Sequence, residues 1–223
     1  MIRRALGALA VLVLLAGCGG TGGEEGTAKL WVTRDRGSEL LLATEVNAGQ
    51  SLLRALATKA DVKTRYGGRF VQSVNGISGS LDAQRDWFWF VNGYEGDRSA
   101  ASYRLHDGDV AWFDYRGWER EGEARVVVGA FPEPFLHGYD GKTRPAVVRY
   151  EGIATRRTAR LARLIGAGSV ARLGTPVPAG ANVLELRHGG DHATAELLGE
   201  SAGDPVRFVL GGELKLTRRY SVP

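Results

Sequence analysis

The chain has 223 residues, of which 43% are hydrophobic and 24% are charged; this composition supports a folded core and excludes wholesale disorder. A single cysteine excludes an intrachain disulfide framework. The formal net charge of +4, from 29 basic and 25 acidic residues, is too small for the strong basic field of a nucleic-acid-binding protein.

The N-terminus is typical of an exported bacterial lipoprotein. Two arginines precede an apolar run from Ala5 to Ala16, which indicates a secretory signal and is too short for a permanent membrane span. Cys18 closes the tetrapeptide Leu15-Ala16-Gly17-Cys18, which resembles the lipobox, whose cysteine is acylated and begins the mature chain. We expect a signal peptide at 1–17 and a flexible tether at 18–28 from lipidated Cys18. Acyl chains such as palmitate would anchor the protein to the extracytoplasmic side of the cell membrane.

The residues from 29 to 118 are expected to form a first domain. Apolar patterning predicts strands at 29–32 and 39–46, then a helix that Ser51 caps and that runs through Lys59. Further strands are expected at 62–66, 69–74, 87–91 and 109–115, with turns at Asn75-Gly76 and Asn92-Gly93. Two strands, one helix and further strands form an α+β order, and one helix packed across a small mixed sheet is the β-grasp arrangement.

A second domain is expected at 119–223, and the charged stretch 119–125 marks the boundary between the two domains. Strands are predicted at 126–130 and 145–150, and a helix at 154–165 with Leu161, Leu164 and Ile165 facing inward. Short antiparallel strands are predicted at 182–188, 194–198, 206–210 and 213–217. This half is therefore predicted as a second small α+β domain of unknown type.

An ordered series of motifs in the first domain carries a resemblance to a known family. The segments are Ala48–Leu56, Gly68–Ile77, Trp87–Gly93 and Tyr103–Trp112. They resemble bacterial lipoprotein domains of unknown function that are similar to the C-terminal β-domain of transcobalamin and intrinsic factor. The resemblance covers about residues 29–118 and implies a β-grasp-like domain whose ligand is a corrinoid or another planar small molecule. The large helical domain that completes the vitamin site in transcobalamin has no counterpart in this sequence.

Aromatic and amide side chains in these motifs are the candidate ligand-binding residues. They are Gln72, Asn75, Trp87, Trp89, Asn92, Tyr94 and Tyr103. Strand alternation places Trp87 and Trp89 on one face and Phe88 and Phe90 on the other. We expect the phenylalanines to pack on the helix and the tryptophans to form an open platform, which either stacks on a planar ring or sugar or docks the second domain. The alternative is that all these aromatic residues belong to the core.

The sequence holds no recognisable catalytic constellation. His106 and Asp107 are not accompanied by a Gly-x-Ser-x-Gly nucleophile motif, and the repeated Gly-Gly pairs lack a phosphate-loop context. The segment His188–His192 offers two imidazoles and a carboxylate, but its glycine pair is typical of a hairpin turn. We therefore expect a protein that is not an enzyme and carries no metal and no resident cofactor.

Three functional hypotheses follow. The first is a cell-envelope lipoprotein that binds a small molecule, a corrinoid or another planar ligand, without catalysis. The second is an envelope scaffold that binds another protein and no small molecule. The third, a hydrolase, has no motif in its favour. The expected partners are the membrane, through the lipid anchor, and either a small molecule or an envelope protein, with no nucleic acid.

The lipid anchor predicts a simple experiment. We expect Cys18→Ser to abolish acylation, because the serine hydroxyl does not replace the thiol that is modified. Metabolic labelling with a fatty-acid probe measures this directly. Label that persists on the serine variant would disprove the lipobox interpretation.

Overall fold

The structure is a computed structural model that describes residues 26–118, 125–190 and 192–212. The predicted signal peptide, Cys18 and most of the tether lie outside these residues, as does the strand predicted at 213–217. Three β-sheets make up most of the described chain, together with three short α-helices and one 3-10 helix.

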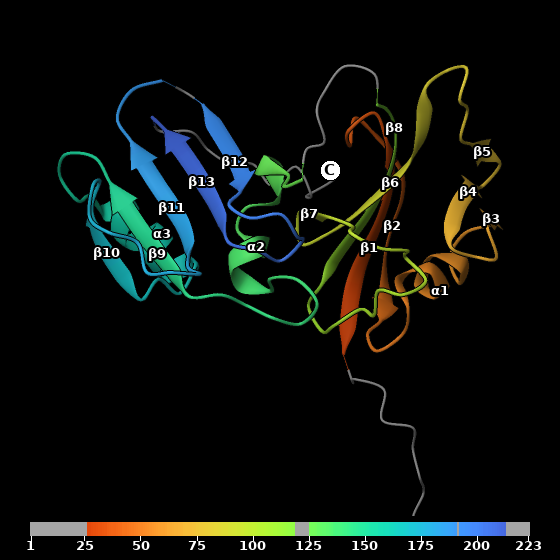
Figure 1. Cartoon of the computed structure of the whole chain (residues 1–223), viewed down its shortest axis with the longest axis horizontal. Helices are drawn as coiled ribbons and strands as arrows, with labels where there is room; N and C mark the ends of the chain where they lie inside the picture. Colours follow the sequence, from red (N-terminus) through yellow and green to blue (C-terminus); the bar gives the residue numbers. More distant parts are fainter. Residues whose placement is uncertain (1–25, 119–124, 191, 213–223) are drawn as a thin grey trace, which may run out of the picture.

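A five-stranded sheet stands at the centre of the molecule (Figure 1), in the order β2-β1-β8-β6-β7. Its strands are β1 (Thr27–Arg34), β2 (Glu39–Asn47), β6 (Arg85–Val91), β7 (Tyr94–Glu95) and β8 (Val110–Gly117). Strand β1 runs parallel to β8, and every other neighbouring pair is antiparallel. The two residues Asn92 and Gly93 form the turn between β6 and β7. Both have positive φ, 50° and 88°, as tight hairpin turns of this kind require.

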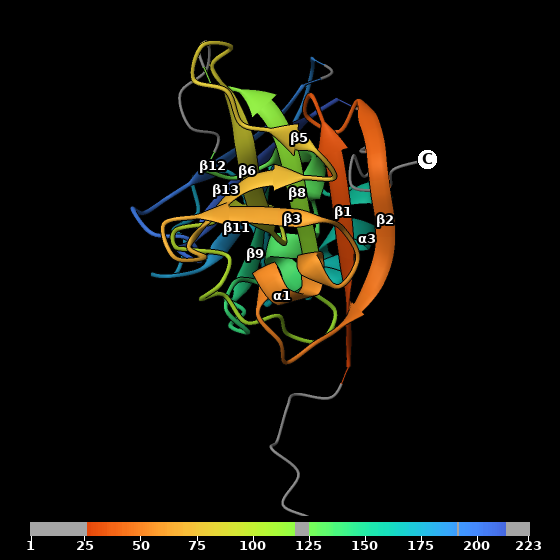
Figure 2. The same cartoon turned by 90° about the vertical axis from the view of Figure 1, so that its right-hand side faces the viewer.

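A second layer covers one face of this sheet. It contains β3 (Val62–Arg65), β4 (Phe70–Val74) and β5 (Ile77–Ser78), which form a three-stranded sheet, and the helix α1 (Leu52–Ala57). Figure 2 shows β3, β4 and β5 running across the direction of β1, β6 and β8. As predicted, Ser51 caps α1, and its hydroxyl accepts a hydrogen bond from the Arg54 amide at 3.3 Å.

The second half of the chain lies on the other side of the central sheet (Figure 1). It begins with η1 (Val128–Ala130) and α2 (Glu133–Leu136), and it contains α3 (Arg156–Leu164). Its five-stranded sheet has the order β10-β9-β11-β13-β12. The strands are β9 (Ala146–Tyr150), β10 (Ser169–Arg172), β11 (Asn182–Arg187), β12 (Ala193–Leu197) and β13 (Val206–Gly211).

The predicted fold class is wrong. Strands make up 43% of the structure and helices 12%, so the chain is mostly β, and neither the α+β description nor the β-grasp arrangement fits it. The helix after Ser51 was expected to pack across the sheet, but α1 has only six residues and covers only part of it. Most of the layer that faces β6 is instead a separate three-stranded sheet, which the sequence reasoning had merged with the central one.

Several local predictions for the second half are also wrong. The strand expected at 126–130 is the 3-10 helix η1. The strands β9, β10, β11 and β13 pair in parallel, and only β12 runs antiparallel to its neighbour β13. Strand β10 was not predicted. Leu161 of α3 and Ile165, which caps its C-terminus, are buried as expected, but Leu164 is 44% exposed.

Strand β6 shows the predicted alternation, but its two faces are the reverse of the prediction. Trp87 belongs to the same hydrophobic cluster as Leu52 and Leu56 of α1 and Val71 of β4. Phe90 belongs to a separate cluster with Trp112 and Ala130, against which Phe88 also packs. The tryptophans therefore face the α1 and β4 layer, and the phenylalanines face the second half of the chain.

A buried asparagine joins the two halves. The Asn92 side chain donates to the Asp109 carboxylate at 2.7 Å and to the Gly138 carbonyl at 3.0 Å, and it accepts from the Val110 amide at 2.8 Å. Asn92 is fully buried, so each of these bonds satisfies a group that water does not reach. The hairpin turn after β6 is thereby fixed to the segment that follows α2.

This network predicts different stabilities for two similar substitutions. Asn92→Ala should lower the free energy of unfolding by about 2–4 kcal/mol, because buried polar groups at Val110 and Asp109 lose their partner. Asn75→Ala is the matched control. Asn75 also precedes a glycine at positive φ, but it is exposed, and its side chain accepts only from the Asp61 amide.

Urea denaturation of both variants measures the difference. We expect about 1 kcal/mol or less for Asn75→Ala, since water can replace its hydrogen bond. Equal losses for the two variants would contradict the role assigned to Asn92.

Candidate functional site

A pocket of about 730 Å³ opens between strand β6 and the layer that contains β4, which is within the usual volume range of small-molecule sites. Its walls come from the end of β3 and from β4, β6, β8 and the segment 95–100. The residues that line it include Tyr66, Arg69, Phe70, Leu81, Asp86, Trp87, Trp89, Glu95, Arg98, Phe113 and Trp118.

The inner wall of the pocket is aromatic and is held rigidly. Trp87 donates its indole N–H to the Ile77 carbonyl at 2.9 Å, and its ring lies 5.4 Å from that of Tyr115. The Trp89 ring lies 5.5 Å from that of Tyr103. Opposite Trp89 on β8 stands Phe113, which is buried. Because these rings pack on one another, their positions are set before any ligand arrives.

The chain passes very close to Trp89 at Gly96. A Cβ atom added to this glycine would lie 2.1 Å from the indole ring, so only glycine fits there. The Gly96 amide also donates to the Trp89 carbonyl at 3.0 Å. The segment 95–100 is thus fitted to Trp89 and forms one wall of the pocket.

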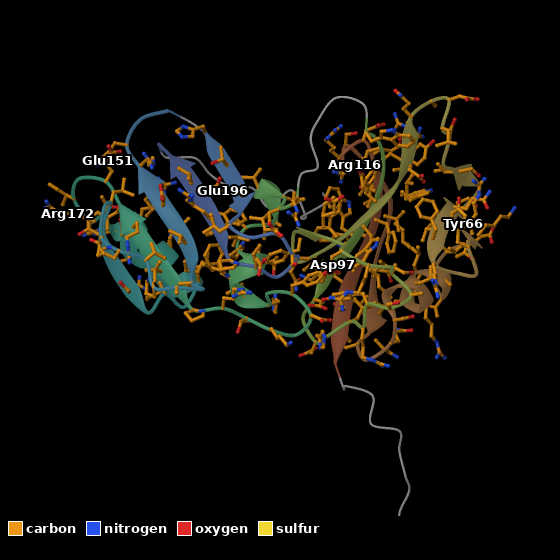
Figure 3. All side chains as sticks on the ribbon, viewed as in Figure 1. Tyr66, Asp97, Arg116, Glu151, Arg172 and Glu196 are labelled. Atoms are coloured by element: carbon orange, nitrogen blue, oxygen red, sulfur yellow. The ribbon has the colours of Figure 1, made fainter. Side chains whose placement is uncertain are left out.

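The rim of the pocket exposes apolar side chains to solvent. Leu81 is 81% exposed and Tyr66 is 79% exposed, while Phe70 and Trp118 are partly exposed at 39% and 36%. Figure 3 shows Tyr66 at the outer side of the three-stranded sheet, and its ring contacts that of Phe70 at a centroid distance of 6.3 Å. Exposed apolar side chains gathered in one place are typical of interaction sites.

A second pocket of about 560 Å³ adjoins the first and is more polar in its lining residues. It shares Tyr66, Phe70, Leu81 and Asp86 with the first pocket, so the two form one continuous groove, which we call the aromatic groove. Asp86 lies at the junction, and its Oδ1 accepts from the Trp87 amide at 2.8 Å. Partial burial raises the pKa of this carboxyl above its ordinary value.

At the other end of the groove, Arg98 is fixed by acidic neighbours. Its guanidinium pairs with Asp97 at 2.8 Å and with Asp140 at 3.2 Å. The Asp97 carboxylate also accepts from the Tyr139 hydroxyl at 2.9 Å, and Figure 3 shows Asp97 between the two halves of the molecule. These bonds hold the 95–100 segment to the second half and raise the pKa of Arg98.

Three of the predicted binding residues line the groove. Trp87 and Trp89 line the larger pocket, and Gln72 of β4 lines the smaller one. Asn75 lies in the exposed turn after β4 and lines neither pocket. Cys18 is outside the described residues.

The other three predicted residues lie between the two halves of the chain. Asn92 makes the network described above, and the Tyr94 hydroxyl donates to the Asp204 carbonyl at 3.5 Å. The buried Tyr103 hydroxyl accepts from the Asp140 amide at 3.1 Å and donates to Asp109 at 3.4 Å. Burial raises the pKa of both tyrosines and of Asp109. These side chains stabilise the contact between the two halves of the chain. The Tyr103 ring also packs against the ring of Trp89.

Sequence reasoning missed the rim of the groove and Asp86, where its two pockets meet. Tyr66, Phe70 and Leu81 come from turns and strand ends that meet only in the folded chain, and Asp86 lies just before the motif that begins at Trp87. The sequence did offer one signal. Tyr66 and Phe70 lie on either side of Gly67-Gly68-Arg69, and glycine pairs mark turns, which usually run over the protein surface.

Neither a metal cluster nor a membrane-spanning helix occurs in the described parts of the chain. Within residues 26–118, 125–190 and 192–212, no three His, Cys, Asp or Glu side chains are placed to hold a metal ion. No helix in these ranges is long and apolar enough to cross a bilayer. The His188 amide donates to the Glu151 carboxylate at 2.7 Å, and the two following glycines have positive φ, as in a turn.

Comparison with known proteins gives a limited result. The family model for a domain of unknown function (DUF4430) matches residues 49–117. This confirms the coarser part of the resemblance, a domain of unknown function within residues 29–118. None of the curated proteins matches the chain.

Two solved structures are similar to part of the chain. One is a "putative metal binding protein" from Ruminococcus gnavus ATCC 29149, at 19% identity and a TM-score of 0.35, covering 44% of this chain and 100% of that one. The other is haptocorrin in complex with Cbi, at 12% identity and a TM-score of 0.35, covering 46% of this chain. The match spans only 28% of haptocorrin.

The exposed rim predicts binding of an apolar dye by the folded protein. We expect the native chain to bind anilinonaphthalene sulfonate. Leu81→Ser should weaken this binding about tenfold, because covering a leucine side chain is worth about 1.5–3 kcal/mol. Ile153→Ser is the matched control, since Ile153 is 77% exposed but lies in the second half, outside the groove. Dye titration followed by fluorescence measures both; equal effects would show that the dye does not report on the groove.

Proposed function

We propose that this protein is a non-catalytic binding protein whose aromatic groove holds a small molecule that contains a ring. The observation that supports this most strongly is the 730 Å³ pocket itself, with Trp87, Trp89 and Phe113 on its inner wall and a partly exposed apolar rim. Aromatic faces attract flat rings through stacking and the hydrophobic effect. The lining rings are fixed by the rest of the core, so little conformational entropy is lost on binding.

The resemblance of residues 29–118 to transcobalamin-like domains makes a corrinoid the first ligand to test. A corrinoid is a large, flat macrocycle that would stack on the exposed aromatic rim, and other planar molecules would use the same surface. We propose no catalytic step, since the sequence holds no nucleophile motif.

We further propose that the protein works at the extracytoplasmic face of the cell membrane. The support is the sequence alone, in which the apolar run ends in Leu15-Ala16-Gly17-Cys18. A lipid anchor and a short tether would hold the groove near the membrane surface. Ligand captured there would be kept from diffusing away from the cell.

The ligand proposal is tested by titrating the protein with cyanocobalamin and cobinamide and following tryptophan fluorescence. We expect saturable quenching, because Trp87, Trp89 and Trp118 all line the groove. The double variant Tyr66→Ser, Phe70→Ser should raise Kd about tenfold, as two aromatic contacts are worth about 0.5–1.5 kcal/mol each. Its control is again Ile153→Ser.

An envelope scaffold that binds another protein is the alternative for the same surface, since an exposed apolar rim also suits a protein partner. No response to corrinoids or to any other ring-bearing ligand would favour the scaffold and contradict the proposed function. If the double variant Tyr66→Ser, Phe70→Ser shows the same quenching as the unchanged protein, the ligand binds outside the groove.

A further inference from the structure

The aromatic groove is longer than one ring requires. Its larger pocket has a volume of about 730 Å³ and its smaller pocket about 560 Å³, and the two meet at the four residues that line both. The rings of Tyr66 and Phe70 lie along this shared wall. A ligand that filled the groove would therefore be elongated, with successive units in the two pockets.

The charges that line the groove balance one another. Three acidic residues, Asp82, Asp86 and Glu95, and three basic residues, Arg65, Arg69 and Arg98, line it. Recognition of a strongly charged ligand requires an excess of the opposite charge. The balanced lining instead suits a neutral ligand that can both donate and accept hydrogen bonds.

The smaller pocket supplies such hydrogen-bonding groups. Gln72, Ser80 and Asp86 line it beside Arg65, so donors and acceptors are interspersed. At the junction, Oδ1 of Asp86 accepts from the Trp87 amide, and within the described chain Oδ2 accepts no hydrogen bond. That second oxygen can accept from a ligand hydroxyl, and bonds to a charged acceptor are stronger than those between neutral groups.

From these features we propose that the groove binds a neutral oligosaccharide, which deepens and rests on the proposed binding function. Sugar rings present an apolar face, which stacks on aromatic side chains, and a rim of hydroxyl groups, which bond to carboxylates and amides. The aromatic wall and the Asp86 junction offer these two kinds of contact side by side. Asp86 is the residue that orients the sugar at the point where the two pockets meet.

The test is isothermal titration calorimetry of the full chain with cellohexaose, maltohexaose and chitohexaose, and with the disaccharide of each series. At least one neutral hexamer should bind at least tenfold more tightly than its own disaccharide, since only the hexamer reaches both pockets. A hexamer of galacturonic acid, which carries one carboxylate on each ring, should bind at least tenfold more weakly than the neutral hexamer.

Asp86→Asn should raise the Kd of the hexamer at least tenfold, because the amide can still accept from the Trp87 amide but is a weaker acceptor for hydroxyls. Glu45→Gln, on the distant strand β2, is the matched control and should have no effect. Equal binding of the charged hexamer, or no effect of Asp86→Asn, would overturn the inference.

Cobinamide in the same experiment separates the two proposals. If cobinamide binds and none of the neutral oligosaccharides does, the oligosaccharide inference is overturned and the proposed binding function stands. Absence of both would overturn the binding function as well.

Discussion

The two-residue alternation of strand β6 is the constraint on which the rest of this structure depends. A strand cannot place neighbouring side chains on one face, so the run Trp87-Phe88-Trp89-Phe90 must present two different aromatic surfaces. Both surfaces are large and apolar, and both must be covered. The central sheet is consequently packed on each side, by α1 and the three-stranded sheet on the tryptophan face and by η1 on the phenylalanine face.

The two faces are covered to different degrees, and this difference creates the groove. On the phenylalanine face, Phe90 packs against Trp112 and Ala130, and the Arg116 guanidinium lies 4.7 Å from the centre of the Phe90 ring. Arg116 is in turn bound to the buried Asp114 carboxylate at 2.7 Å. On the tryptophan face, the small sheet crosses the central strands (Figure 2), and the larger pocket opens between the two layers. The open space lies there, beside Trp89.

Much of the local structure could be predicted from the sequence, but its assembly could not. The turns at Asn75-Gly76 and Asn92-Gly93, the cap at Ser51 and the alternation of β6 follow from local chemistry. The fold class and the orientation of β6 depend on which distant layer covers each face, and tryptophan and phenylalanine are equally able to fill a core. The parallel pairing in the second half was also missed. The sequence of a short apolar strand does not indicate whether the neighbouring strand runs parallel or antiparallel to it.

For the site, sequence reasoning found part of the inner wall and chose residues of the right type at the wrong places. Trp87, Trp89 and Gln72 line the groove, whereas Asn92, Tyr94 and Tyr103 lie at the junction of the two halves. Aromatic and amide side chains are as well suited to a buried contact between two parts of the chain as to binding a ligand. The rim residues Tyr66 and Leu81 meet only through the crossing of the two sheets, which no local pattern indicates.

The central claim is that a ligand lies on the tryptophan face of the central sheet and does not contact the cluster of Trp31, Phe90 and Trp112 on the opposite face. The chain has five tryptophans, and ¹⁹F NMR of 5-fluorotryptophan-labelled protein resolves them individually once each is assigned by substitution. On addition of a ligand that binds, the account predicts that the resonances of Trp87, Trp89 and Trp118 shift, while those of Trp31 and Trp112, which belong to the phenylalanine-face cluster, stay in place. Shifts at Trp31 and Trp112 with none at Trp89 would contradict it.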